Sequence, residues 1–432
     1  MSTKAVILVG GPSRGTRFRP LSMNIPKPLF PVAGRPIIWH PIAALAKLEQ
    51  VTEILLVGFF EDFVFRDFLD ACAAEFPNIH FKYLREYRSL GTAGGIYHFR
   101  NEILRHSPEQ LFVLHADVCC SYPLADMYRF HLEQGRRGTI MGTRVDRGSA
   151  HRYGCLVADA ATHEVLHYVE KPETFVSNLI SCGVGLFHRT VFDSIRSALE
   201  ARHQRMDQDR DYEFDADSYD VLRLEQDVIR PMAAAHQLSV YVTDQFWRQI
   251  KSAASAVPAN AAYLAQMQHD PEAAKGLTLA RPFIRNPNSS PAGADVPEGP
   301  EIEGPVYIHP TAQIHPTAKL GPNVSIGPRV VLGKGVRVRD AIILDGAEVK
   351  ANACVLHSVI GWRTKLGAWT RVDGTPLTGR HDTEGVTQAG VKNPSVTILG
   401  QEVTVADECV IRNCIVLPNK ELRSSYHDDI LM

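Results

Sequence analysis

The stretch IHPTAQIHPTAKLGPNVSIGPRVVLGKGVRVRDAIIL, residues 308–344, decides the fold of the C-terminal third of the chain. An aliphatic residue returns at every sixth position, in the order Ile308, Ile314, Leu320, Ile326, Leu332, Val338 and Leu344. Neither a helix nor a flat strand repeats at six residues. One six-residue unit cannot bury its own aliphatic side chain, but three units make a triangular coil, and stacked coils share an inner column. The repeat therefore predicts a parallel β-helix, with Gly321, Gly327 and Gly333 at corners.

The same repeat continues, with interruptions, to the C-terminus. Its phase breaks at Lys350, resumes at Leu356, is lost across residues 373–394, and returns as Leu399, Val405, Ile411 and Leu417. We expect residues 373–394 to form a polar loop outside the coil stack, and loops of that length are usually functional or disordered. Upstream of the repeat, a helical segment at 259–267 and the sequence RNPNSSPAGADVPEGP, residues 285–300, indicate a linker.

The chain before about residue 250 alternates short β-rich runs with amphipathic stretches. The strand-like runs are Lys4–Val9, Ile54–Val57, Leu111–Leu114 and Thr139–Met141. Helical spacing links Phe65, Phe68, Leu69 and Cys72, and nearly links Ile96, Phe99 and Ile103. This alternation predicts an α/β, Rossmann-like, mostly parallel sheet with helices on both faces, whose ligands sit beyond the carboxyl ends of the strands. The predicted domains are residues 1–255 and 301–432, joined by 256–300.

The composition excludes several classes of function. Basic and acidic side chains number 46 and 48, so the net charge of -2 gives no global field for nucleic acid or anionic lipid. No apolar stretch approaches the roughly 20 residues of a membrane span, and no signal peptide begins the chain, so we expect a cytoplasmic protein. The 8 cysteines form no C-x-x-C pair, which favours reduced, buried thiols over disulfides or a zinc site.

A second stretch, GGPSRGTRFRP at residues 10–20, directly follows the first strand-like run. Gly10 and Gly15 fit the frame G-x-x-x-x-G, but Thr16-Arg17 stands where a P-loop needs Lys and Ser or Thr, and the Rossmann G-x-G-x-x-G does not fit. One interpretation is a turn whose backbone N–H groups approach phosphate oxygens while Arg17 and Lys27 neutralise their charge. The alternative is a tight strand-to-helix connection with solvated arginines.

The longer stretch GGPSRGTRFRPLSMNIPKPLFPVAGRPII, residues 10–38, resembles the signature of the sugar-1-phosphate nucleotidyltransferases. The expanded glycine loop, GTAGGIYHFR from Gly91, WRQIKSA from Trp247 and LPNKEL from Leu417 are similar to the mannose-specific guanylyltransferases of that family, and to their regulatory, alpha-type branch. The resemblance runs from residue 3 to the last residues and implies a left-handed β-helix of hexapeptide repeats. The family's reaction is attack by a sugar phosphate on the α-phosphorus of a nucleoside triphosphate, assisted by Mg²⁺.

The resemblance also implies roles for single residues. Gly10, Gly11, Gly15 and Thr16 would hold the nucleotide and its phosphates, Arg17 the leaving phosphates and Lys27 the reacting phosphorus, while Gly91 and Thr92 would contact base and ribose. The sugar and its phosphate would lie on Gly154, Glu170, Lys171 and Ser181. Ser181 departs from the family, which usually has Asn there, so one amide donor is lost. Without the resemblance, Glu170-Lys171 would be a solvated strand end and Gly154 a turn glycine.

The expected metal site is incomplete. The strand LFVLHAD places Asp117 at the carboxyl edge of the sheet, where a carboxylate can bind Mg²⁺. Active relatives add a second carboxylate in a W-x-D-I-G pattern, but this chain has Trp247-Arg248-Gln249-Ile250-Lys251. Gln249 keeps an acceptor oxygen without the charge, and Lys251 adds an ammonium, so Mg²⁺ binding should be weak or absent. Asp244 is a possible substitute, although its position five residues upstream places it on the wrong side of the strand end.

These observations leave several functions open. The favoured one, which the resemblance implies, is a regulatory subunit that binds GDP-mannose, GTP or mannose-1-phosphate and controls a catalytic beta-type guanylyltransferase in homo- and hetero-oligomers. The same resemblance implies that loop 373–394 reaches toward that partner. The alternatives are a working GTP:mannose-1-phosphate guanylyltransferase and a scaffold subunit that binds no nucleotide sugar. A β-helix acyltransferase is disfavoured, because no acyl-CoA signature is visible and His309, His315 and His357 are expected at coil corners.

Overall fold

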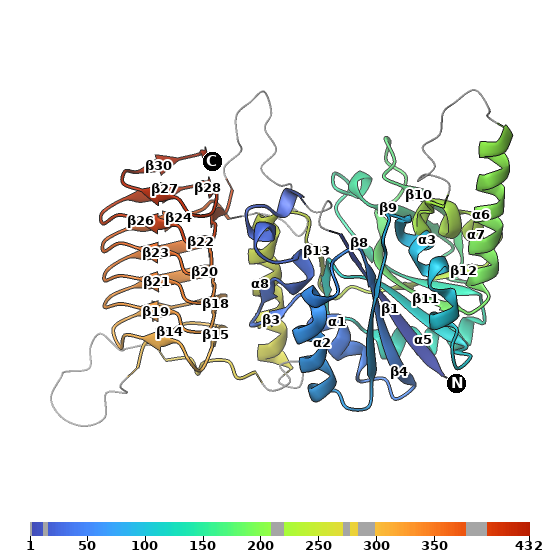
Figure 1. Ribbon diagram of the computed structural model, residues 1–432, viewed down its shortest axis with the longest axis horizontal. Coiled ribbons are helices and arrows are strands. Elements are labelled where there is room, and N and C mark those ends of the chain that lie inside the picture. The colour runs from blue at the N-terminus through green and yellow to red at the C-terminus, as the bar shows by residue number, and fades with distance from the viewer. Residues whose placement is uncertain (1, 12–15, 209–219, 271–276, 284–298, 377–394) are drawn as a thin grey trace. The chain divides into compact units, whose positions relative to one another are not determined.

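The computed structural model describes residues 2–11, 16–208, 220–270, 277–283, 299–376 and 395–432 (Figure 1). The internal contacts of the chain define two compact units. We call residues 1–14 and 38–247 the sheet unit, and residues 15–37 and 248–432 the β-helix unit. Gly15, residues 271–276 and 284–298 of the expected linker, and residues 377–394 of the expected loop lie outside the described residues. The predicted domain limits, 1–255, 256–300 and 301–432, stay a prediction.

The sheet unit is built on a mixed, mainly parallel sheet in the order β10-β9-β11-β6-β1-β4-β5, with β8 paired to β11 and β12. Strand β1 runs parallel to β4 and β6, β4 to β5, and β8 to β12. Strand β11 is antiparallel to β6, β8 and β9, and β9 to β10. The strands are β1 (Thr3–Gly10), β4 (Val51–Gly58), β5 (His80–Arg85), β6 (Gln110–His115), β7 (Val118–Cys120), β8 (Gly138–Arg144), β9 (Gly154–Ala158), β10 (Val165–Glu170), β11 (Leu179–His188) and β12 (Leu238–Val242). The expected α/β fold is confirmed.

Helices cover both faces of this sheet. On one face a buried cluster joins sheet residues such as Val113 to Ile96 of α3 and Phe192 of α6. On the other face Phe112 packs on Tyr128 of α5, with ring centroids 6.3 Å apart. The helical elements are α1 (Trp39–Leu45), α2 (Phe63–Glu75), α3 (Gly91–His98), α4 (Arg100–Ile103), α5 (Leu124–Gln134), the 3-10 helix η4 (Ala150–Arg152), α6 (Val191–Gln208), the π-helix η6 (Leu224–Ile229) and α7 (Arg230–Ala234). The Phe65–Cys72 stripe is confirmed as α2, whereas the stripe through Phe99 is divided there between α3 and α4.

The C-terminal part of the β-helix unit is a stack of parallel β coils, which confirms the β-helix prediction (Figure 1). Buried aliphatic residues, including Leu320, Ile326 and Leu332, form its inner column. Gly321, Gly327 and Gly333 each directly follow a strand, as expected of corners. The strands are β14 (Glu301–Ile302), β15 (Val306–Ile308), β16 (Gln313–Ile314), β17 (Lys319–Leu320), β18 (Val324–Ile326), β19 (Val331–Leu332), β20 (Arg337–Ile343), β21 (Glu348–Val349), β22 (Cys354–Ile360), β23 (Lys365–Leu366), β24 (Arg371–Asp373), β25 (Thr397–Leu399), β26 (Thr404–Val405), β27 (Val410–Arg412), β28 (Ile415–Val416), β29 (Glu421–Leu422), β30 (Tyr426–His427) and β31 (Ile430–Leu431).

A change in coil length explains the break in the sequence repeat. Val306 aligns with Val324, eighteen residues on, but Val324 aligns with Ala341, only seventeen residues on. Each later coil of that length moves the inward position back by one residue, so Val349 and Val355 are buried in the column. The predicted inward positions Leu344, Leu356 and Leu417 are therefore wrong by one residue, since the column contains Ile343, Val355 and Val416 instead.

The expected helical segment at 259–267 is confirmed as α8 (Ala256–His269), and it packs on β18, β20 and β22 of the coil stack. Asn260 of α8 is fully buried and its side-chain oxygen accepts hydrogen bonds from Ser325 Oγ at 2.7 Å and Ala33 N at 2.9 Å. This face of the stack is apolar, with Ile342 and Val359 buried. The unit also contains η1 (Thr16–Phe18), η2 (Leu21–Met23), η3 (Lys27–Leu29), β2 (Pro31–Val32), β3 (Arg35–Pro36) and η7 (Ala253–Ser255), while β13 (Trp247–Gln249) spans the boundary between the two units.

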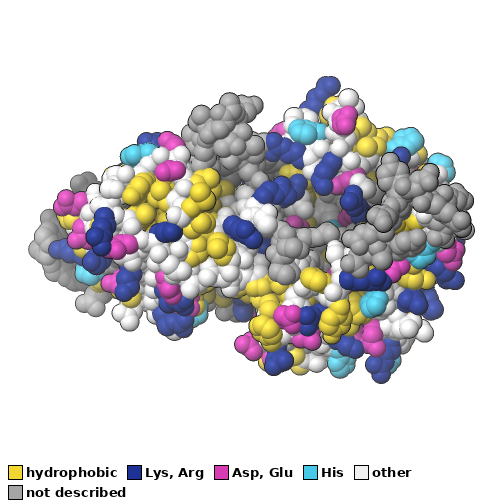
Figure 2. Space-filling model, turned by 45° about the horizontal axis from the view of Figure 1, so that its top comes forward, with side chains coloured by type: hydrophobic (Ala, Val, Ile, Leu, Met, Phe, Trp, Pro, Cys, Tyr) yellow, Lys and Arg dark blue, Asp and Glu magenta, His cyan; other side chains and the backbone are white. Residues whose placement is uncertain are grey.

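The mixture of charges on the surface and the burial of the cysteines agree with what the composition predicts. Figure 2 shows Lys and Arg side chains interspersed with Asp and Glu on the visible face. The cysteines are free, and all are buried except the half-buried Cys354. Among the described residues, none of the helices combines the length and the apolar character that a membrane crossing requires.

Candidate ligand-binding site

The carboxyl ends of β1 and β4 form one side of the site. Phe59 N donates to the carbonyl oxygen of Gly10 at 2.8 Å, which fixes the end of β1 against the end of β4. A hollow of about 90 Å³ lies there, lined by Leu8, Gly10, Gly11, Val57, Phe59, Glu86, Ser89, Gly91 and Thr92. The structure therefore brings together four of the residues expected on the nucleotide side, Gly10, Gly11, Gly91 and Thr92. Their contact with a nucleotide stays a prediction.

Gly91 is required by a close backbone approach. It adopts a φ of 75°, and a Cβ atom at this position would lie 2.3 Å from the carbonyl oxygen of Leu222. The same carbonyl accepts a hydrogen bond from Ala93 N at 3.0 Å, and Leu222 N donates to Leu90 O at 2.9 Å. The first turn of α3 thus binds the segment that leads into η6 through backbone hydrogen bonds.

Thr92 connects the first turn of α3 to a charged pair. Its hydroxyl oxygen accepts from Leu224 N at 2.7 Å, and its hydroxyl donates to Glu225 Oε2 at 3.3 Å. The other carboxylate oxygen of Glu225 lies 3.1 Å from His115 Nε2. Three distant segments, the start of α3, the end of β6 and the π-helix η6, therefore meet at the carboxyl edge of the sheet. π-helical turns are rare and often occur at functional sites.

Both groups of this pair favour their charged forms. Burial alone would lower the pKa of His115, but its hydrogen bond to Glu225 and the charges of Glu225, Asp117 and Glu170 outweigh burial and raise that pKa. Burial opposes ionisation of Glu225 too, yet His115 and Thr92 lower the pKa of this carboxyl. Neither residue was predicted from the sequence. His115 stood in the quoted strand, two residues before Asp117, but Glu225 belongs to no motif that would link it to the edge.

The residues expected on the sugar side gather on β9, β10 and β11. Glu170 pairs in register with Gly154, and its Oε2 accepts from the hydroxyl of Tyr168 at 2.7 Å. A Cβ atom on residue 154 would lie 2.0 Å from that hydroxyl oxygen, so the ladder requires glycine there. Lys171 Nζ lies 3.1 Å from the second oxygen of Glu170. These contacts give Gly154 a packing role, and leave its role toward a sugar a prediction.

Ser181 lies on β11 next to an irregularity in the pairing of β11 with β8, between Ser181 and Gly185. Gly183 N donates to Ser181 Oγ at 3.5 Å. A Cβ atom on Gly183 would lie 3.4 Å from Cδ2 of His115, so the imidazole packs directly on this irregular segment. The His115 side chain thus joins the nucleotide side, through Glu225 and Thr92, to the sugar side at β11.

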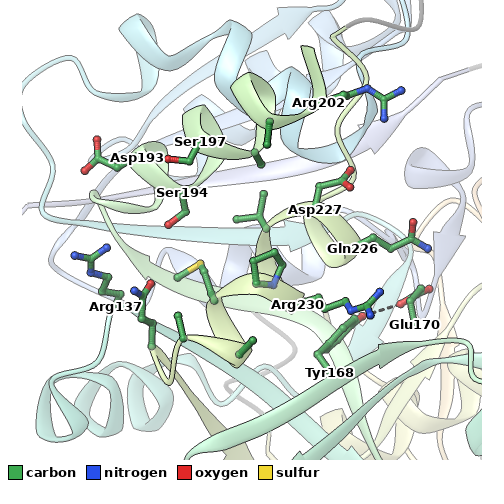
Figure 3. A pocket seen from close by; sticks show the side chains of 18 of the residues that line it. Arg137, Tyr168, Glu170, Asp193, Ser194, Ser197, Arg202, Gln226, Asp227 and Arg230 are labelled. Carbon is green, nitrogen blue, oxygen red and sulfur yellow. Dashed lines mark hydrogen bonds between the residues drawn. The ribbon is translucent and has the colours of Figure 1, made fainter. Parts of the chain in front are cut away.

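A wider hollow of about 1020 Å³ opens between α6 and the η6–α7 segment (Figure 3). Tyr168 and Glu170 lie at one side of it, joined by their hydrogen bond, while Arg137 and Asp193 lie at the other side. Small residues of α6, Ser194, Ser197, Ala198 and Ala201, line its length. The hollow gives a bulky ligand group room beside Glu170, since small-molecule sites commonly occupy about 300–1,000 Å³.

The expected metal residues are placed as follows. Asp117 lies two residues beyond the end of β6, at the carboxyl edge of the sheet, and it is half-buried, while its role as a metal ligand stays a prediction. Trp247 is anchored in the sheet unit, with its indole N–H donating to Cys182 O at 2.9 Å. Gln249 and Lys251 are half-buried residues of the β-helix unit. The described residues contain no group of three or more His, Cys, Asp or Glu side chains that could hold a metal ion. With an amide at 249 and an ammonium at 251, this donor set does not fit a two-carboxylate Mg²⁺ site.

The remaining expected residues belong to the β-helix unit. Thr16 and Arg17 are exposed on η1. Lys27 lies on η3, and its ammonium donates to the carbonyl oxygen of Ile250 at 3.0 Å. Within this unit the structure therefore brings Lys27 next to the Gln249–Lys251 segment. Asp244, the possible substitute ligand, belongs to the sheet unit and follows β12.

Comparison with known proteins agrees with this arrangement. Residues 4–266 match the family described as Nucleotidyl transferase, and residues 302–431 match the family described as GMPPB C-terminal domain. A Schizosaccharomyces pombe protein named probable mannose-1-phosphate guanyltransferase is 44% identical, with 100% of each chain covered. Proteins named mannose-1-phosphate guanylyltransferase regulatory subunit alpha are 44% identical in Dictyostelium discoideum, over 100% of this chain and 99% of the relative, and 46% identical in Homo sapiens, over 99% and 100%. The chain belongs to the nucleotidyl transferase family, among relatives that include the regulatory alpha subunits of mannose-1-phosphate guanylyltransferase.

Proposed function

We propose that this chain is a regulatory subunit of GDP-mannose synthesis. In this proposal it binds GDP-mannose, or the related GTP and mannose-1-phosphate, at the carboxyl edge of the sheet unit. The occupied subunit then lowers the activity of a catalytic, beta-type guanylyltransferase with which it assembles, as feedback inhibition requires. Its own turnover is weak or absent.

One observation carries the proposal: the segment Trp247-Arg248-Gln249-Ile250-Lys251 has a neutral amide and a cation where a metal-dependent transferase needs an anionic ligand. Loss of one charge-stabilising group in an active site costs about 3 kcal/mol of transition-state stabilisation, or about two orders of magnitude in rate. Ligand binding does not require that group. The hollow at Gly10, Gly11, Gly91 and Thr92 and the cluster at His115, Glu170 and Glu225 keep polar contacts available. The names of the alpha relatives support the same conclusion.

A working guanylyltransferase is the second candidate, favoured by the name of the Schizosaccharomyces pombe relative and by the cation at Lys27. Two measurements separate the candidates. Calorimetric titration of the purified chain with GDP-mannose, with and without Mg²⁺, should give saturable binding that does not depend on the metal. A turnover assay with GTP, mannose-1-phosphate and Mg²⁺ should give little GDP-mannose. Robust turnover without any partner would replace the regulatory proposal, and absence of GDP-mannose binding would indicate a scaffold.

The regulatory part requires the partner. We expect the chain to co-purify with a catalytic beta-type subunit and to make that subunit's turnover more sensitive to added GDP-mannose. A catalytic subunit that responds to GDP-mannose equally with and without this chain would contradict the proposal.

The metal deficit can be tested by restoring the carboxylate. In Gln249→Asp combined with Lys251→Gly, we expect Mg²⁺-dependent turnover to rise by about tenfold or more, because the added anion and the lost ammonium both favour the cation. The matched control is Gln249→Asn, which keeps a neutral amide and should not gain activity. No gain in the double variant would place the deficit elsewhere, with Ser181 as the next position to change.

A further inference from the structure

We infer that His115, held by Glu225, is a specificity-determining residue that binds a hydroxyl group of the ligand's sugar. This inference rests on the proposed function, because it names the part of the GDP-mannose-type ligand that the side chain reads. No motif in the sequence marks His115 or Glu225 for this role.

The imidazole is held in one orientation by its partner. His115 Nε2 lies 3.1 Å from Glu225 Oε1, and a carboxylate can only accept, so Nε2 carries the proton of this contact. Glu225 is held in turn by Thr92, whose hydroxyl donates to Oε2 at 3.3 Å. Within the described residues, Nδ1 of His115 has no hydrogen-bond partner, and about a quarter of the side chain is exposed. A partly exposed and oriented ring with one open nitrogen is suited to contact a ligand.

The charges around the ring favour a hydroxyl over a phosphate. Glu225 lies against the ring, and the charges of Glu225, Asp117 and Glu170 all act on His115, so the electrostatic environment of the ring is negative. A phosphate beside them would be repelled, whereas a sugar hydroxyl is neutral and both donates and accepts. A hydroxyl can therefore bond Nδ1 whether or not that nitrogen carries a proton, and the contact does not depend on titration.

The position of the ring also points to the sugar. Its Cδ2 edge lies next to Gly183 of β11, two residues from Ser181, while Glu170 and Tyr168 lie on β10, which β9 separates from β11. Ser181 has a short side chain whose oxygen is engaged by Gly183 N at 3.5 Å. His115 is the longer polar side chain at this place, and it bridges the β11 segment and the nucleotide side at Thr92. A nucleotide sugar that spans these two sides would therefore place its sugar beside this side chain.

The test compares two ligands that differ only by the sugar. Calorimetric titration with GDP-mannose and with GDP is carried out on the full chain and on His115→Ala. We expect GDP-mannose to bind about five- to tenfold more weakly to the variant, the effect of one lost hydrogen bond, and GDP to bind within about twofold of the original chain. His80→Ala, an exposed histidine on β5, is the matched control and should change neither affinity.

The outcomes separate this inference from the proposed function. If the original chain does not bind GDP-mannose, the proposed function is wrong and the inference falls with it. If it binds GDP-mannose but His115→Ala weakens both ligands equally, or neither, the proposed function stands and the inference is wrong. A readout on the unaltered protein covers a variant that fails to fold: in ¹⁵N-histidine spectra, Nδ1 of His115 should shift with GDP-mannose and not with GDP, and an unshifted Nδ1 would overturn the inference.

Discussion

A histidine lies at each end of strand β6, and one surrounding favours a neutral ring while the other favours a charged ring. At the amino end, His131 of α5 bonds Thr139 Oγ1 at 2.8 Å and Gln110 Oε1 at 3.0 Å, and all three residues are buried. At the carboxyl end, His115 faces the carboxylate of Glu225 at 3.1 Å. Burial, with a smaller effect from the charge of His188, lowers the pKa of His131 to about 4. The carboxylates near His115 raise the pKa of that ring instead.

This difference distinguishes a histidine that holds the fold from one that is available to a ligand. His131 has neutral partners on both ring nitrogens, so its hydrogen-bonding capacity is fully used inside the protein. His115 uses one nitrogen on Glu225 and sits among more negative charge than its own ring can balance. Perturbed and incompletely satisfied groups of this kind concentrate at functional sites. The comparison therefore predicts that changes at the amino end affect stability and changes at the carboxyl end affect binding.

The largest effect should come from His131→Ala. The change leaves Thr139 and Gln110 buried without their partner and opens a cavity under α5, so we expect the free energy of unfolding to fall by about 3–5 kcal/mol. Urea denaturation of the sheet unit, followed by circular dichroism, measures it. His80→Ala, at an exposed site, should change stability by less than about 0.5 kcal/mol. A loss at His131 no larger than this control would contradict the role given to the amino end.

The next largest effect should be a pH dependence of the unfolding free energy that is caused by His131. The unfolded chain binds a proton at this residue below its ordinary pKa of 6.5, while the folded protein resists protonation until about pH 4. Its contribution is thus fully present above pH 6.5 and is lost as the pH falls toward 4. Between pH 7.5 and pH 5 we expect a loss of about 2 kcal/mol from this group.

The isosteric amide His131→Gln isolates this contribution from other titrating groups. Its unfolding free energy should be less dependent on pH by about the same 2 kcal/mol, because glutamine does not titrate. Parallel pH profiles for the original chain and His131→Gln would show that another group causes the acid sensitivity.

Sequence alone predicted the elements that repeat and missed those made by long-range contact. The six-residue spacing of Leu320, Ile326 and Leu332 was sufficient for the β-helix, because each coil buries its neighbours' side chains at a fixed period. It was wrong at Leu356, since a single residue fewer per coil cannot be distinguished from a break until the strands are paired. The sheet was predicted in the same way, from the alternation of strand-like runs with amphipathic stretches.

The site was predicted only where a motif marked it. Gly10, Gly91 and Asp117 stood in stretches with a family resemblance, and the structure places them at the expected edge. Glu225 is separated from Thr92 by 133 residues and becomes part of the site only through their hydrogen bond. Its π-helix was not marked by any motif in the sequence, and the segment that leads into it is held on α3 by the backbone hydrogen bonds of Leu222. Tertiary contact, and not local preference, selects these residues.

Thr92→Val should loosen the contacts at the carboxyl end of β6 with a moderate loss of stability. Valine keeps the shape but removes the hydroxyl that accepts from Leu224 N and donates to Glu225, so one backbone N–H loses its partner. We expect about 1–2 kcal/mol less stability and weaker GDP-mannose binding, measured by urea denaturation and calorimetry. Thr92→Ser, which retains the hydroxyl, should restore most of both. A serine variant as weak as the valine variant would mean that the methyl group and its packing matter more than the hydrogen bonds.

The smallest change in stability is expected for Glu225→Gln, and this variant sharpens the comparison most. The amide keeps the size of the side chain, but its single oxygen can accept from only one of His115 and Thr92, and the charge that holds the imidazole is removed. About three quarters of each side chain is buried, and one hydrogen bond is lost, so the free energy of unfolding should fall by no more than about 1 kcal/mol. If the carboxyl end is built for a ligand, the same substitution should still weaken GDP-mannose binding about threefold or more, because a less firmly held ring loses its orientation toward the sugar. Lost stability with unchanged GDP-mannose affinity would instead make Glu225 a structural residue like Gln110. The two ends of β6 would then differ in charge, but both would serve the stability of the fold.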